Sequence, residues 1–302
     1  MVQSGEKARR RSWGQYYTPA QVVHLAYDLL AALAGAGDAS GERRVIDPAC
    51  GDGAFLRVAL ERGLADPAQC VGFDKDPAAE PAWADLRARG AVLMVHEGLY
   101  ASGSAAAHAP DGSFEWVVGN PPYAGAKLSA LRRLAATNPP PGERALAAHL
   151  CDKFVLWRAT PRRDGRLPLE WDEVSAGALS ADDVERLATF PIEVLFLERF
   201  VQLSRPGGLL AIVLPDGVLA NARLRHVRAW ALERLTMEAV VALPRSTFRA
   251  GRTTAKTALV VARHAPPPPG HITMLVSLDR LPEADDRVRL VQAWRQRRPG
   301  SA

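Results

Sequence analysis

The stretch RRVIDPACGDGAF, residues 43–55, indicates the fold of this 302-residue chain. It begins with a short apolar run that ends at Asp47, which is typical of a buried strand. Gly51 and Gly53 then allow a tight turn, and a helical pattern starts near Ala54. A strand, a glycine turn and a helix in this order predict a βα unit whose loop lies at the carboxyl end of the strand, where α/β sheets bind ligands.

Six further apolar runs follow, separated by mostly helical patterns. They are CVGFDKDP, AVLMVHEG, FEWVVGNPP, GLLAIVLPDG, MEAVVALPRSTF and KTALVVARH. We therefore predict a seven-stranded, doubly wound, Rossmann-like α/β sheet with helices on both faces. An amphipathic helix precedes the first strand, with Thr18 expected as its N-cap and Pro19 as its first helical residue.

Two segments depart from this alternation. Residues 124–190 carry proline-rich and charged stretches between short helical pieces, so we interpret them as an insertion within a catalytic domain that covers residues 1–264. The run APPPPG, residues 265–270, is typical of a stiff spacer. It opens a tail, residues 265–302, in which a last short strand and a helix are expected over 271–298.

The composition is that of an ordinary globular protein, with 48% hydrophobic and 24% charged residues. The net charge of +5 permits a polyanionic partner without requiring one. Cys50, Cys70 and Cys151 have neither disulfide nor metal-ligand spacing, so we expect no disulfide framework and no metal site. Because no apolar run suits a signal peptide or a membrane span, a cytoplasmic protein is expected.

Two stretches carry the candidate chemistry. The strand FEWVVG is followed by Asn120, two prolines and Tyr123, and the prolines would hold the amide and the aromatic ring at a fixed separation. Asp74 follows Gly51 by 23 residues, where nucleotide-binding α/β folds place a carboxylate for ribose hydroxyls. Asp47 and Asp52 would repel a pyrophosphate but suit S-adenosylmethionine (SAM), which has an adenosine end and a cationic end. The alternative is a plain strand–turn–helix connection with exposed acids.

The motifs GQYYTP (14–19), DPACGDGAFL (47–56), GFDKDP (72–77) and NPPY (120–123), in this order, resemble the N6-adenine DNA methyltransferases of the γ arrangement. The carboxyl half, with LPRSTF at 243–248, is similar to the N-6 DNA methylases that include the modification subunits of type I restriction-modification systems. The resemblance implies a class I SAM-dependent methyltransferase that methylates the exocyclic N6 of adenine in DNA.

The resemblance also implies roles for individual residues. Asn120 and the main-chain oxygen of Pro121 would accept the two amino hydrogens of the adenine, with Pro122 stiffening the clamp. Tyr123 and Phe248 would stack on a base flipped out of the duplex, although both could be core residues. Contacts to the cofactor are expected from Tyr17, Thr18, Pro19, Asp47, Ala49, Cys50, Gly51, Gly53, Phe55, Asp74, Lys75, Glu97 and Asn120.

Cys50 is more simply interpreted as a small packing residue than as a nucleophile, because the sequence positions no histidine to activate it. No separate target-recognition domain is expected, so a separate specificity subunit is a possible partner beside DNA. Two other functions stay open: a methyltransferase that acts on RNA or on a protein glutamine, and a SAM-binding and DNA-binding subunit without turnover.

Overall fold

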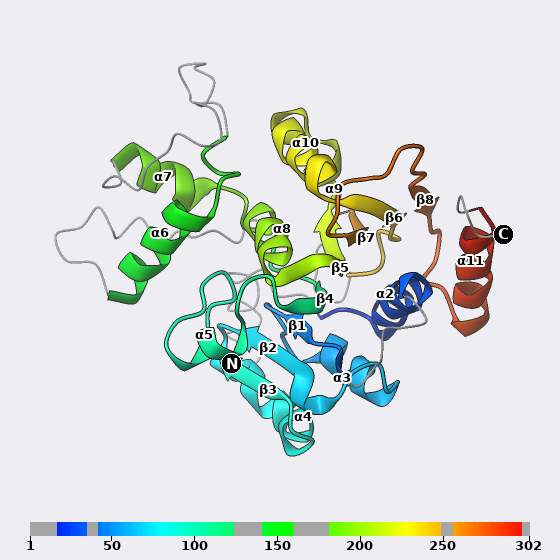
Figure 1. Cartoon of the computed structure of the whole chain (residues 1–302), viewed down its shortest axis with the longest axis horizontal. Helices are drawn as coiled ribbons and strands as arrows, with labels where there is room; N and C mark the ends of the chain where they lie inside the picture. The colour runs from blue at the N-terminus through cyan, green and yellow to red at the C-terminus, as the bar shows by residue number, and fades with distance from the viewer. Residues whose placement is uncertain (1–16, 35–41, 124–140, 160–180, 249–255, 298–302) are drawn as a thin grey trace.

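The structure is a computed structural model that describes residues 17–34, 42–123, 141–159, 181–248 and 256–297. These residues form an eight-stranded sheet in the order β3-β2-β1-β4-β5-β7-β6-β8 (Figure 1). Its strands are β1 (Val45–Asp47), β2 (Cys70–Asp74), β3 (Val92–Val95), β4 (Phe114–Gly119), β5 (Ser204–Pro215), β6 (Thr236–Ala242), β7 (Thr257–Arg263) and β8 (Met274–Ser277).

Each of the seven apolar runs predicted as strands forms a strand, and the predicted α/β sheet is confirmed. The prediction of seven strands was one fewer than the eight strands of the sheet. The last short strand expected in the tail, β8, pairs parallel to β6 and extends the same sheet. β1 to β5 run parallel, whereas β7 is antiparallel to both of its neighbours, β5 and β6.

Helices cover both faces of the sheet. Successive strand residues point to opposite sides, so a strand that is apolar throughout has an apolar surface to bury on each face. Ile46, Val117 and Leu210 belong to the core on the side of α8 (Ile192–Leu203) and α10 (Arg225–Arg234). Their neighbours Val45 and Trp116 belong to the core on the side of α2 (Ala20–Leu33), α3 (Ala54–Glu61), α4 (Ala84–Ala88) and α11 (Ala284–Arg297). Figure 1 shows α8 and α10 on one side of the sheet and α2, α3 and α11 on the other.

The first described helix, α2, is the amphipathic helix that was predicted, and its buried residues include Val22, Leu25, Ala26, Leu29, Leu30 and Leu33. Its start differs by one residue from the prediction. Pro19 is the N-cap, with an extended backbone (φ −56°, ψ 141°), and no side chain caps the helix. The carbonyl oxygen of Pro19 accepts the first helical hydrogen bond from the N–H of Val22, so Thr18 lies one residue outside the cap.

The described parts of the 124–190 segment include α6 (Pro141–Lys153) and α7 (Ala181–Thr189). Leu150, Phe154 and Leu187 are buried in the same core cluster as α8. The turn after α6 is fixed to α8 by Glu198, whose two carboxylate oxygens accept hydrogen bonds from the N–H groups of Val155 (2.6 Å) and Leu156 (3.1 Å). These parts therefore pack on the core of the sheet.

Shorter helices complete the described chain. They are η2 (Pro67–Gln69), η3 (Pro77–Trp83), α5 (Ser104–His108), α9 (Asp216–Ala220) and η5 (Ala222–Leu224). Within the described residues, no helix combines the length and the apolar character needed to cross a membrane.

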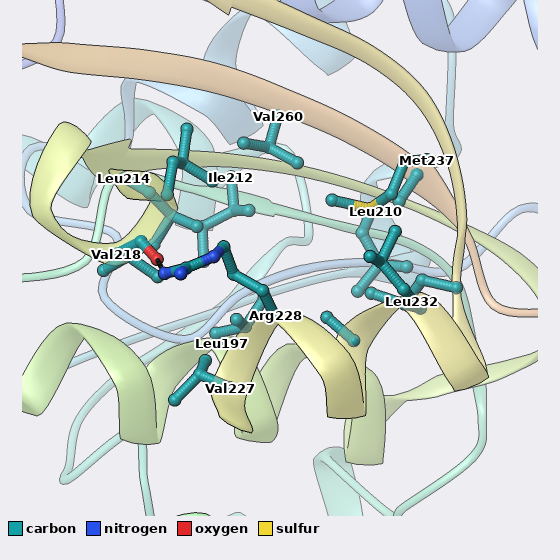
Figure 2. Close-up of a pocket in the computed structure, with 14 residues that line it drawn as sticks. Leu197, Leu210, Ile212, Leu214, Val218, Val227, Arg228, Leu232, Met237 and Val260 are labelled. Atoms are coloured by element: carbon teal, nitrogen blue, oxygen red, sulfur yellow. Dashed lines mark hydrogen bonds between the residues drawn. The ribbon is translucent and has the colours of Figure 1, made fainter. Parts of the chain in front are cut away.

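An apolar pocket of about 100 Å³ lies between α10 and the sheet (Figure 2). Its lining is apolar except for Arg228, whose guanidinium donates to the carbonyl oxygens of Val218 (3.2 Å) and Asn221 (2.8 Å). None of the residues expected to hold cofactor or substrate lines this pocket.

Candidate functional site at the carboxyl ends of the strands

The candidate site is assembled by four neighbouring parallel strands, in the order β3-β2-β1-β4. Because these strands run parallel, their carboxyl ends lie at one edge of the sheet. Asp47 ends β1, Asp74 ends β2 and Asn120 directly follows β4. The strand order reverses between β1 and β4, and such a switch point is where open α/β sheets bind ligands. The structure thus brings the glycine turn and the NPPY stretch to the same edge.

The turn after β1 is held by backbone hydrogen bonds. The N–H of Gly51 donates to Asp74 Oδ2 (2.9 Å), and the N–H of Cys50 donates to the carbonyl oxygen of Phe73 (2.8 Å). Gly51 and Gly53 have left-handed backbone angles, with φ of 52° and 82°. Space is open beside Gly51, where an added Cβ would meet no atom within 4 Å. The turn is therefore tied to β2 on one side and leaves room for a ligand on the other.

Gly119, the last residue of β4, lies directly against the carboxylate of Asp47. A Cβ at Gly119 would be 2.5 Å from Asp47 Oδ1, and its φ of 151° lies in a region that side chains rarely adopt. The same Oδ1 accepts a hydrogen bond from the N–H of Ala49 (3.0 Å). The sequence interpretation overlooked Gly119, although a glycine within a strand pattern often marks a close approach of the backbone. This contact joins the cofactor turn to the residue before Asn120.

The acids at this edge are poorly solvated and repel one another. Burial raises the pKa of Asp47 well above its usual range, the N–H of Ala49 opposes the rise, and Asp74 and Asp52 add to it. Burial also raises the pKa of Asp74, against the N–H donors of Asp76 and Gly51. A nearby positive charge would favour the ionised form of these acids. The edge therefore suits a ligand with a cationic group.

The loop after β3 reaches the turn after β1 through Gly98. A Cβ at Gly98 would fall 1.7 Å from the carbonyl oxygen of Pro48, so no side chain fits at this position. The close contact gives a physical reason for glycine at this position. Beside it, Glu97 is half-buried, and its Oε1 accepts a hydrogen bond from the N–H of Leu99 (3.3 Å).

Tyr123 and Phe248 are brought into contact, although they come from distant segments. Their ring centroids are 6.2 Å apart and their planes meet at 77°, an edge-to-face arrangement. Tyr123 is 0% exposed and Phe248 is 3% exposed, and Phe248 belongs to a core cluster. The side-chain oxygen of Asn120 is also shielded from solvent. The two rings are therefore in direct contact and leave no space between them for a base. A base can stack between them only if one of the rings moves.

Two of the expected cofactor residues, Phe55 and Cys50, have side chains buried in the core. Phe55 is buried in the core against Tyr27 of α2, whose hydroxyl donates to the Phe55 carbonyl oxygen (2.9 Å). Cys50 is buried and unbridged, as a packing residue would be. Tyr17 is 52% exposed just before α2, and Lys75 is half-buried after β2. In the described ranges, no three His, Cys, Asp or Glu residues group as a metal site would need.

Residues 3–133 match the model of the N-6 DNA Methylase family. The matched residues contain all four amino-terminal motifs, so the resemblance inferred from the sequence is confirmed there. LPRSTF and the rest of the carboxyl half lie outside the methylase match. Among curated proteins, none matches the chain.

Solved structures of methyltransferases have the same α/β fold as this chain. One from Listeria monocytogenes, described as a class I SAM-dependent methyltransferase, has a TM-score of 0.58 at 17% identity and matches 92% of this chain. A type I restriction-modification methyltransferase subunit from Streptococcus thermophilus has a TM-score of 0.62 at 19% identity over 95% of this chain.

A third similar structure is described as a modification subunit of a type I restriction enzyme from Vibrio vulnificus YJ016, with a TM-score of 0.57 at 16% identity over 99% of this chain. This chain spans 71% of the Listeria protein but only 54% and 57% of the other two.

Proposed function

We propose that this protein transfers the methyl group of SAM to the exocyclic N6 of adenine in DNA. The observation that carries the proposal is the contact between Gly119 and Asp47, at the switch point of the sheet. It sets the acidic glycine turn beside the Asn-Pro-Pro-Tyr stretch, so one edge holds a candidate SAM site next to a candidate amine clamp. Both stretches fall within the residues that match the methylase family.

The residues around the turn fit SAM. Asp74, which accepts hydrogen bonds from the N–H groups of Gly51 and Asp76, would also accept hydrogen bonds from the ribose hydroxyls, because a carboxylate is a strong acceptor of hydrogen bonds. Asp47 would face the cationic end of SAM, whose charge would stabilise the buried carboxylate. Glu97 would lie toward the adenine of SAM. When bound, SAM supplies an electrophilic methyl group.

The amine clamp would act by positioning. The lone pair of the adenine amino nitrogen is delocalised into the ring, so the nitrogen is a poor nucleophile. If the side-chain oxygen of Asn120 and the main-chain oxygen of Pro121 accept its two hydrogens, the nitrogen is held with its lone pair directed at the methyl group. The chain then needs no general base before attack.

We propose that the buried Tyr123–Phe248 pair is a closed form of the site, which opens when the base enters. Flipping a base out of the duplex takes a few kcal/mol, and stacking on an aromatic ring returns about 1–3 kcal/mol. Separation of the two rings would expose Tyr123 to the base and leave Phe248 as the opposite wall. Phe248 directly precedes residues 249–255, which lie outside the described part of the chain.

We further propose that the protein works in a restriction-modification or phage-defence system with a separate specificity subunit. Two of the similar solved structures are described as parts of type I systems, which supports this setting. The division into a catalytic domain at 1–264 and a tail at 265–302 is also a proposal. In the structure, β8 of that tail adds to the sheet and Trp294 of α11 is buried in the core shared with α2.

The direct test is transfer of a tritiated methyl group from SAM to unmethylated duplex DNA, to RNA and to a protein bearing an accessible glutamine, followed by identification of the product. N6-methyladenine in DNA alone supports the proposal. Label in RNA or in glutamine alone would replace it with the corresponding alternative. SAM binding without any transfer, even with the co-purifying subunits present, would indicate a binding subunit without turnover.

A further inference from the structure

The glycine turn after β1 is held in place by η3, a segment that the family motifs do not include. Trp83, at the end of η3, is fully buried, and its indole Nε1–H donates a hydrogen bond of 2.8 Å to the carbonyl oxygen of Gly51. The N–H of Gly51 in turn donates to Asp74. The two peptide groups that flank Gly51 are therefore fixed by side chains from the strand β2 and from the helix that follows it.

The same segment packs against the second glycine of the turn. A Cβ at Gly53 would lie 2.6 Å from Leu86 Cδ1 and 3.7 Å from Trp83 Cδ1. On the other side of the turn, the space beside Gly51 is open. The turn is thus tightly packed on the side of Trp83 and Leu86 and free on the side where a ligand would lie.

Trp83 is itself held by Arg87. The guanidinium carbon of Arg87 lies 5.2 Å from the centre of the Trp83 ring, within the range of a cation–π contact. Arg87 also donates to the carbonyl oxygen of Leu93 (2.7 Å) and forms an ion pair with Glu80 (2.8 Å). The indole therefore has little freedom to turn away from Gly51.

We infer that Trp83 is a positioning residue for cofactor binding: its hydrogen bond presets the peptide of Gly51 in the conformation that receives SAM. The inference rests on the proposed function of this turn. A left-handed glycine has many alternative conformations, and without the indole donor the ligand itself would have to order the turn. The effect should thus fall on SAM affinity, whereas the residues that hold the substrate base are untouched.

The test is the dissociation constant of SAM, measured by calorimetry, for the wild type and for Trp83→Phe, which keeps a buried ring but removes the donor. Trp157→Phe is the matched control, because the Trp157 indole is also buried and also donates to a backbone carbonyl, that of Leu150 (3.1 Å), in the other core cluster. We expect the dissociation constant of SAM to rise about five- to tenfold in Trp83→Phe, because the buried carbonyl of Gly51 loses its hydrogen-bond donor. In the control, this dissociation constant should stay unchanged. In turnover, KM for SAM should rise while kcat at saturating SAM holds.

Equal SAM affinity in Trp83→Phe and the wild type would overturn the inference and leave the proposed function intact. A wild type that binds no SAM would overturn both. If Trp83→Phe does not fold, Arg87→Met is the second variant, because it removes the guanidinium that holds the indole from its solvent side. Arg89→Met is its control, since Arg89 donates to the carbonyl oxygen of Leu60 and not to a group that holds Trp83. A SAM constant raised about two- to threefold by Arg87→Met alone supports the inference, and equal constants in the two variants contradict it.

Discussion

The ring of Tyr123 meets the ring of Phe248 edge to face, with centroids 6.2 Å apart and both side chains buried. This contact links the stretch after β4 to the stretch after β6. It also makes two roles for Phe248 separable, because a core residue needs only volume whereas a stacking residue needs an aromatic face.

Replacement of Phe248 by Leu distinguishes these roles. If Phe248 stacks on the flipped base, Phe248→Leu should weaken binding of DNA that carries 2-aminopurine at the target position by about tenfold, while stability falls by less than ~1.5 kcal/mol. Phe200→Leu, at a fully buried position on α8, is the control and should leave DNA binding unchanged. Wild-type DNA affinity in Phe248→Leu would assign Phe248 to the core alone.

The contact between Gly98 and Pro48 predicts a severe effect of one methyl group. Gly98→Ala should lower the free energy of unfolding by roughly 3 kcal/mol or more, because the Cβ would fall 1.7 Å from a backbone oxygen that can move only with its chain. Gly217→Ala is the control, since its Cβ would meet nothing within 4 Å and it lies in α9. We expect this variant to be neutral or up to ~1 kcal/mol more stable in urea titrations. Similar losses in both variants would contradict the close contact.

Glu198 predicts a pH dependence of stability. Burial raises its pKa to about 7 from 4.5, while the N–H groups of Val155 and Leu156 and the charges of Arg158 and Arg234 oppose the rise. Between these two values the folded state binds more protons than the unfolded state, so the stability from this group is present below pH 4.5 and is lost as the pH rises through 7. The total is on the order of 3 kcal/mol.

The measurement is urea unfolding of the wild type and Glu198→Gln across this pH range. The amide of the variant does not titrate, so the wild type should lose stability relative to the variant as the pH rises. A wild type that gains stability relative to the variant would mean that the N–H donors outweigh burial and hold the pKa below 4.5.

The apolar pocket beneath α10 predicts a stabilising substitution. Ala262 of β7 lines the pocket, and Ala262→Val adds two methyl groups that the space can accept, so the free energy of unfolding should rise by about 1 kcal/mol. Ala211 of β5 is equally buried but packs in the core on the opposite face of the sheet. Ala211→Val should therefore lower stability by about 1–3 kcal/mol through overpacking. A loss of stability in Ala262→Val would mean that the pocket closes in solution.

Local sequence patterns were sufficient for the strands, because a strand buried on both faces leaves a continuous apolar run such as WVV or LLAIVL. They were not sufficient for β8, where exposed Leu275 and half-buried Met274 leave a weak pattern that did not assign the strand to the sheet. The start of α2 was missed by one residue because a Thr-Pro pair fits two cap registers, and only the backbone angles of Pro19 decide between them.

Those parts of the candidate site that lie within one short stretch of sequence could be predicted, and the others could not. NPPY and the glycine turn can each be recognised in the sequence, and the parallel strands bring them to one edge of the sheet. The contacts that fix the site join residues that no local pattern connects: Gly119 with Asp47, Gly98 with Pro48, and Trp83 with Gly51. The exposure of Phe248 likewise depends on how the chain returns to Tyr123, which periodicity cannot reveal.

The most direct test of the proposed chemistry is a comparison of Asn120→Ala with the wild type in two measurements: methyl transfer to adenine in duplex DNA, and the dissociation constant of SAM. Asn221→Ala is the control, because that amide caps η5 by accepting a hydrogen bond from the N–H of Arg223 (2.9 Å). The proposal predicts that Asn120→Ala loses methyl transfer by about 10²- to 10³-fold or more while SAM still binds, and that the control keeps both. Transfer at the wild-type rate by Asn120→Ala, or loss of SAM binding together with transfer, would contradict a clamp that acts on the adenine amine.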